Sequence, residues 1–122
     1  MKTITTTLIM AIMLAGTGLK AQNKVNNETA VEAKKMYLIE REIPDAGLLT
    51  SEQLKAISQK SCSVLKGMNG IEWVHSYVTG NKIFCVYKAE NEELIREHGQ
   101  LGGFPVNKIT LITTTISPST AQ

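Results

Sequence analysis

The order of four strand-forming runs and two helical runs most strongly constrains what this chain can fold into. One helical run follows the first strand-forming run, and the other follows the third. The second and third runs flank Gly80-Asn81, a dipeptide typical of the loop of a β-hairpin. The first run is ended by the turn sequence Pro-Asp-Ala-Gly at residues 44–47. The predicted strands are 36–43, 71–79, 82–89 and 106–116.

Two helices are predicted between these strands. Thr50 can act as the N-cap of the first helix, and Gln53 three residues later completes a capping box. Apolar side chains then recur at helical spacing until Gly67, which ends the helix. Asn91 is expected to cap the second helix, which covers residues 92–101.

The resulting order is β-α-β-β-α-β, the split βαβ arrangement of ferredoxin-like α+β folds. We expect a four-stranded antiparallel sheet with both helices on one face, in a domain that spans residues 36–118. No predicted element covers the other face, and an apolar face of that size is unusual on a soluble monomer. We therefore expect a homodimer in which these faces meet, as in a dimeric α+β barrel.

The N-terminal residues have the features of a secretion signal. Lys2 is followed by an uncharged, largely apolar run at 4–15, which is too short to span a bilayer. A small residue, Ala21, stands where cleavage is expected, so residues 1–21 are predicted to be a signal peptide. The polar segment 22–35 is predicted to be a flexible linker. The mature protein is expected to be periplasmic or secreted, without a membrane anchor.

Loss of the signal would change the charge of the chain. The sequence has 13 basic and 11 acidic side chains, and removal of Lys2 and Lys20 leaves 11 basic against the same 11 acidic. This balance argues against nucleic acid or an anionic membrane surface as a partner.

The sequence has no strong enzymatic motif. It lacks a phosphate-binding glycine loop, a CxxC pair, an HExxH and a GxSxG, which argues against nucleotide chemistry and serine hydrolysis. The sequence therefore favours a function other than catalysis. The side chains that could still act as acids, bases or metal ligands are Glu40, Glu42, His75, Tyr77, Cys85, Tyr87 and His98.

The hairpin loop decides which of these side chains share a face of the sheet. Strict alternation places Trp73 on the same face as His75. A two-residue loop, the commoner geometry, turns Cys85 away from His75 and towards the helices. A three-residue loop instead groups His75 with Cys85 and Tyr87. Both registers are consistent with the sequence.

Each candidate also has a structural interpretation. His75 suits either a hydrogen bond in a dimer interface or a metal ligand, because neutral imidazole binds nickel, copper and zinc. His98 lies near a predicted helix C-terminus, where the helix dipole favours histidine without any ligand. Glu40 and Glu42 are expected at a solvated edge or in a salt bridge.

The two cysteines, Cys62 and Cys85, are open to two interpretations. In an oxidising compartment they can form a disulfide. They can equally be small apolar side chains that pack in the core.

Two segments resemble a known family. Residues 73–99 (WVHSYVTGNKIFCVYKAENEELIREHG) and 102–109 (GGFPVNKI) are similar to the core of a bacterial domain-of-unknown-function family. That family includes a small dimeric nickel-binding protein with a ferredoxin-like fold. The resemblance implies a ferredoxin-like homodimer that binds nickel or another divalent transition metal. His75, Cys85 and His98 lie in the matching segments, and their chemistry makes them the candidate metal ligands.

Three functions follow from these observations. The first is an exported homodimer that binds a divalent metal of the nickel type. The second is a non-catalytic interaction module whose open sheet face only dimerises. The third is a dimeric α+β barrel enzyme acting on a small hydrophobic molecule, with His75 as the acid or base.

Overall fold

A computed structural model describes residues 33–122 of the chain. The predicted signal peptide, 1–21, and all but the end of the predicted linker, 22–35, lie outside the described residues. Within residues 33–122, no helix has the length and apolar character needed to cross a membrane.

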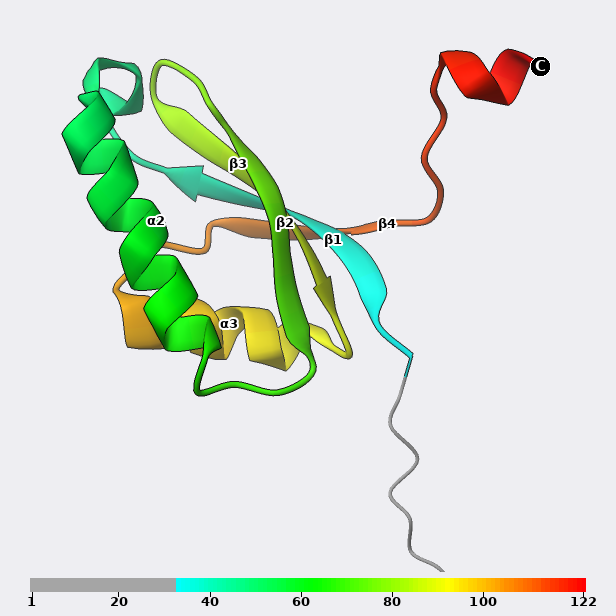
Figure 1. Ribbon diagram of the computed structural model, residues 1–122, viewed down its shortest axis with the longest axis horizontal. Coiled ribbons are helices and arrows are strands. Elements are labelled where there is room, and N and C mark those ends of the chain that lie inside the picture. The colour runs from blue at the N-terminus through cyan, green and yellow to red at the C-terminus, as the bar shows by residue number, and fades with distance from the viewer. Residues whose placement is uncertain (1–32) are drawn as a thin grey trace, which may run out of the picture. The chain divides into compact units, whose positions relative to one another are not determined.

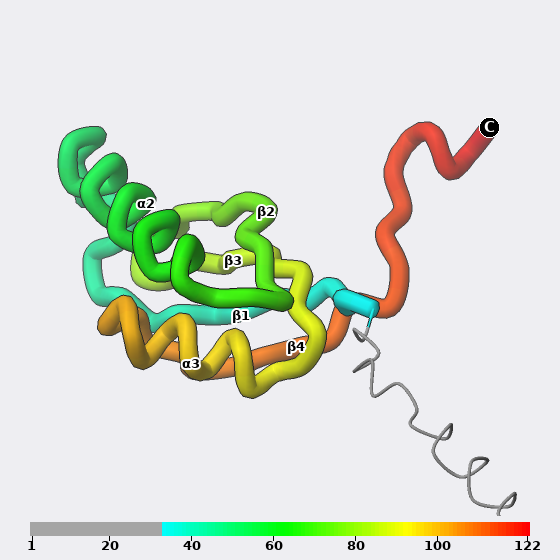
Figure 2. Tube along the Cα trace, turned by 60° about the horizontal axis from the view of Figure 1, so that its bottom comes forward, coloured from blue at the N-terminus to red at the C-terminus, as the bar shows by residue number. Residues whose placement is uncertain are grey.

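The elements follow the predicted β-α-β-β-α-β order, with two short 3₁₀ helices added (Figure 1). Both long helices lie on the same side of the sheet (Figures 1 and 2). The ferredoxin-like α+β fold is therefore confirmed. The elements are β1 (Lys35–Glu42), η2 (Ala46–Leu48), α2 (Ser51–Leu65), β2 (Ile71–Val78), β3 (Lys82–Ala89), α3 (Glu92–Gly102), β4 (Lys108–Ile112) and η3 (Pro118–Ala121).

The sheet has the strand order β2-β3-β1-β4, and every pair of neighbours is antiparallel. The last strand is shorter than predicted, because β4 is an edge strand that pairs with β1 alone. Ile112 is paired with Met36, next to the first residue of β1, so the chain beyond Ile112 has no partner strand there. A partner, and not propensity, sets the end of a strand at this edge.

The helices begin where local sequence signals place them. Thr50 accepts a hydrogen bond from the Gln53 backbone N–H, and the Gln53 side chain accepts one from the Thr50 backbone, so the capping box is complete. The Asn91 side chain caps α3 by accepting from the Leu94 N–H. At the end of α3, Gly103 adopts a left-handed conformation with φ of 72°, which glycine adopts without a steric penalty.

The two faces of the sheet differ in what lies over them. We call the face beneath α2 and α3 the covered face; it carries alternate residues of β1 and β3, such as Ile39 and Ile83, and both are buried. We call the opposite face the open face; it carries Leu38, Glu40, His75, Tyr77, Phe84 and Val86. The core packs between the covered face and the helices, and its buried members are Tyr37, Ile39, Ala46, Ile71, Ile83, Cys85, Tyr87, Ala89 and Ile95.

The hairpin has the two-residue loop, so that alternative is confirmed. The Thr79 backbone N–H donates to the Lys82 carbonyl oxygen at 2.8 Å. A register shift between Trp73 and His75 then pairs Trp73 with Tyr87 but His75 with Val86. The prediction that Trp73 and His75 share a face is wrong, because this β-bulge adds one residue and reverses the alternation.

Candidate functional site

His75 lies exposed on the open face, in the middle of β2. Its ring makes an edge-on contact with the ring of Tyr77, with centroids 5.0 Å apart. Tyr77 is itself 59% exposed, unusually high for an aromatic residue on a sheet. Both rings are therefore accessible to a ligand or to a second molecule.

An apolar strip crosses the open face beside these rings. In register, His75 lies opposite Val86, which lies opposite Leu38 on the central strand β1. Tyr77 lies opposite Phe84 in the neighbouring row. Neither α2 nor α3 lies over this strip, in which Val86 is buried and Leu38 and Phe84 are half-buried, with the exposed His75 at its edge.

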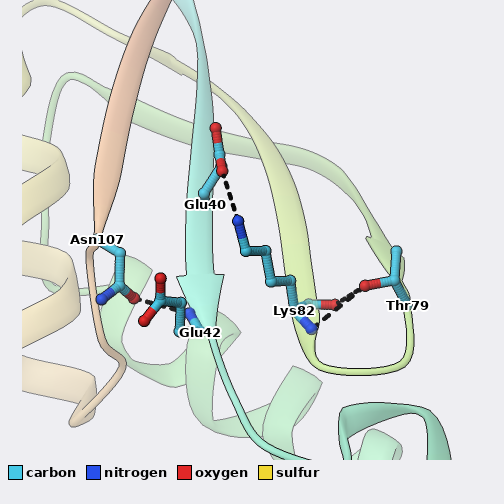
Figure 3. Close-up of polar contacts among 5 residues, drawn as sticks. All are labelled: Glu40, Glu42, Thr79, Lys82 and Asn107. Carbon is cyan, nitrogen blue, oxygen red and sulfur yellow. Dashed lines mark hydrogen bonds and ion pairs between the residues drawn. The ribbon is translucent and has the colours of Figure 1, made fainter.

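Two acidic residues of β1 make polar contacts at one end of this strip, Glu40 through its side chain and Glu42 through its backbone (Figure 3). Glu40 Oε1 accepts an ion-paired hydrogen bond from Lys82 Nζ at 3.2 Å. The Glu42 backbone N–H donates to Asn107 Oδ1 at 2.7 Å. The salt-bridge interpretation is thus confirmed for Glu40.

Cys85 lies on the covered face and is buried, on the opposite side of the sheet from His75. Its sulfur accepts a hydrogen bond from Arg41 Nε at 3.4 Å. Cys62 is exposed on α2, and both cysteines are free, so the structure has no Cys62–Cys85 disulfide.

His98 on α3 is completely buried on the covered side of the sheet, the side on which Cys85 lies. Its Nε2 lies 3.2 Å from Ser61 Oγ on α2, and its ring packs against Tyr87 and Phe104, with centroids 5.3 and 5.5 Å away. Burial, and secondarily the positive charge of Arg41, lowers the pKa of His98 below its usual value. Both effects favour the neutral imidazole over the charged one.

The three predicted metal ligands do not meet within one chain. Cys85 and His98 lie on the covered side of the sheet, whereas His75 lies on the open face. In the described part of the chain, no three His, Cys, Asp or Glu side chains are grouped as a metal site requires. The Arg41 guanidinium beside Cys85 also repels a cation at that position. A one-chain site built from these three residues does not fit this geometry.

Arg41 is the residue that the sequence reasoning missed. It is only 3% exposed, although its neighbours Glu40 and Glu42 suggest a solvated stretch of strand. The signal was present in the alternation, because Arg41 has the same parity as Tyr37 and Ile39 and must share their face.

Comparison with known proteins identifies relatives of this fold. The family model described as nickel responsive protein SCO4226-like matches residues 37–112. The crystal structure of SCO4226 from Streptomyces coelicolor A3(2) matches with a TM-score of 0.59 and 14% sequence identity, covering 66% of this chain and 99% of that one. At this identity the structural match establishes the shared fold. No curated protein matches the chain.

Proposed function

This chain belongs to the SCO4226-like family of nickel-responsive proteins, and from that premise we propose that it binds nickel or a similar divalent metal ion as an exported homodimer. The observation that carries the proposal is the exposed His75 on an uncovered, partly apolar sheet face. Neutral imidazole is a good ligand for nickel, copper and zinc.

The open face supplies the reason for a dimer. Leu38 and Phe84 are half-buried there beside the buried Val86, and neither α2 nor α3 lies over them. A two-fold axis through this face would bury the same strip from both subunits. It would also bring a His75 from each subunit to one interface, which supplies ligands that a single described chain does not group together.

Calorimetric titration of nickel into chelator-treated protein, residues 22–122, tests metal binding. His75→Ala is expected to lower the affinity for nickel. The loss should exceed the roughly 10–100-fold that is typical when only a residue behind a metal ligand is changed. Cys85→Ser and His98→Gln complete the test of the three predicted ligands, and their buried positions lead us to expect little change in nickel affinity. Unmodified protein that binds nickel no more tightly than millimolar would contradict the proposal.

Sedimentation velocity tests the dimer separately. Leu38→Arg puts a charge in the middle of the open face, on a side chain that is not in the core beneath the helices. We expect the unmodified protein to sediment as a dimer and this variant as a folded monomer. An unmodified protein that remains monomeric at every concentration would rule out the dimer without testing the metal.

Export is proposed on the predicted signal peptide, residues 1–21, and on no other observation. Expression of the full chain in a bacterium with two membranes tests it. The mature protein is expected in the periplasm or medium with Gln22 as its first residue, as intact mass measures. Recovery of the uncleaved chain from the cytoplasm alone would contradict the proposal.

A further inference from the structure

The C-terminal segment 113–122 leaves the folded body of the domain. In both views it runs away from the sheet and from the two long helices (Figures 1 and 2). All of its residues are exposed, and Ile116, its one large apolar side chain, is 77% exposed. The hydrogen bonds of η3 join residues of the segment itself, such as Ser117 and Thr120. An isoleucine is thus left largely in solvent.

Residues 113–117, which we call the arm, have the composition of a strand. Four of these five residues are β-branched, the type that strands favour. The backbone of Ser117 is extended, with φ of −152° and ψ of 175°. Pro118 ends the arm, because proline has no N–H to donate to a neighbouring strand. The arm therefore has the features of a strand but no partner strand within residues 33–122.

The two edges of the sheet are not equally protected against the addition of another strand. On β2, a bulge interrupts the register after Trp73, and Glu72 is ion-paired with Lys34 at 3.0 Å. Bulges and charges are typical of an edge that resists pairing. By contrast, β4 keeps a regular register with β1, and the chain from 109 to 117 has no charge, glycine or proline. The edge that can accept a strand is therefore β4.

We propose that the arm of one subunit pairs antiparallel with the outer edge of β4 in a second copy of this chain, and that the exchange is reciprocal. The free edge, 108–112, and the arm, 113–117, are each five residues long. A two-fold axis through Thr113 pairs 109–112 of each chain with 114–117 of the other, and Pro118 follows the last pair. Such a contact uses the same surface of both chains and closes on itself.

This pairing gives Ile116 a place to pack. Strand alternation continued from Ile112 points Ile116 to the open face, opposite Thr110 of the other chain. Thr110 in turn lies opposite Leu38, so the three side chains share one row across the strands. The arm therefore adds its isoleucine to the apolar strip of the open face.

The arm exchange rests on the homodimer proposed above and adds a second contact to it. A single two-fold axis can pass between the open faces and through the β4 edges, because edge pairing covers neither face of the sheets. Two paired strands alone are only marginally stable in water. The arm therefore strengthens the open-face contact and does not replace it.

Disulfide trapping tests the pairing in metal-free protein, residues 22–122. Thr113→Cys is made in a Cys62→Ser background, because Cys62 is exposed whereas Cys85 is buried. Residues opposite each other in an antiparallel pair have Cα atoms about 4.5–5.5 Å apart, which a disulfide can span. Oxidation is therefore expected to give a covalent dimer on a denaturing gel.

Ser119→Cys in the same background is the matched control. It lies in the same exposed segment, beyond Pro118. Strand geometry places the two copies of residue 119 more than about 25 Å apart in the paired arms. This variant is therefore expected to remain monomeric on the gel.

Sedimentation velocity measures how much the arm contributes to the dimer. Ile116→Ser is expected to raise the dimer dissociation constant about tenfold or more, the factor that corresponds to the burial of one isoleucine side chain. A chain that ends after Ser117 keeps the arm and lacks only η3. It is expected to dimerise as the unmodified protein does.

The outcomes separate the arm exchange from the open-face dimer. Equal trapping of Thr113→Cys and Ser119→Cys in a protein that sediments as a dimer would overturn the exchange and leave the open-face dimer standing. An unchanged dissociation constant for Ile116→Ser would do the same. An unmodified protein that remains monomeric would overturn both. Because no metal is present, none of these results depends on nickel binding.

Discussion

The covered and open faces of this sheet differ in whether their charged side chains have an oppositely charged partner. On the open face, Glu40 is paired with Lys82 at 3.2 Å beside solvent. On the covered face, the next residue, Arg41, is buried and makes no ion pair within residues 33–122. A paired surface charge needs no further explanation, whereas an unpaired buried charge calls for one. The open face is therefore suited to contact with a second subunit, whereas the covered face holds a buried charge that no carboxylate of residues 33–122 pairs with.

The largest expected difference between the faces is in packing. Ile39→Ala removes a fully buried side chain from the covered face and is expected to cost about 2–5 kcal/mol of unfolding free energy, measured by urea denaturation. Leu38→Ala on the open face is expected to cost less in an isolated subunit. Equal losses from both variants at every protein concentration would contradict this difference in packing between the two faces. A loss for Leu38→Ala that appears only at high concentration would place Leu38 in a dimer contact.

Close packing on the covered side is tested by Gly99→Ala. A Cβ on Gly99 would lie 2.6 Å from Val106 Cγ2 and 3.0 Å from the Phe104 carbonyl oxygen, so one of these must shift. We expect a loss of about 1–3 kcal/mol in unfolding free energy. Gly80→Ala in the hairpin loop is the control, because a Cβ there meets nothing within 4 Å. An equal loss in both variants would mean that the close approach is not the cause.

A smaller effect is expected from pH, and it arises on the covered side. Burial and Arg41 lower the pKa of His98 in the folded state from its usual 6.5, so the unfolded chain takes up a proton first as pH falls. Stability is therefore expected to fall as pH drops below about 6.5. His98→Gln is expected to flatten this dependence between pH 7.5 and 5.5 in urea denaturation. The matched change on the open face, His75→Gln, is expected to preserve it; the reverse result would contradict the assignment.

The smallest effect is expected from the open-face ion pair. Glu40→Gln removes the charge that Lys82 pairs with, and the Lys82 side chain is 41% exposed. We expect a loss of about 0.2–1 kcal/mol, towards the lower end because of this exposure, and a smaller loss in high salt. Glu42→Gln is the control, since the bond to Asn107 comes from the Glu42 backbone. A loss of several kcal/mol would indicate that Glu40 is buried in an assembly.

Much of the fold was predictable because its signals are local. The Thr50–Gln53 capping box sets the start of α2 within four residues of sequence, and the structure has both of its hydrogen bonds. The Gly80-Asn81 loop is equally local, and its geometry settles the hairpin register. The candidate site was less predictable. One bulged residue near Trp73 changes which side chains share a face, and bulges have no firm sequence signal.

By itself, the sequence determined the order of the elements, the helix caps and the hairpin loop, because each depends on residues a few positions apart. Only the tertiary structure decided that His75 is separated from Cys85 and His98, that β4 ends at Ile112, and that Arg41 is buried beside a cavity. These outcomes depend on pairings between distant strands and on helices packed over them. Strand alternation can assign a residue to a face, but only packing decides whether that face is covered and whether a charge on it has a partner.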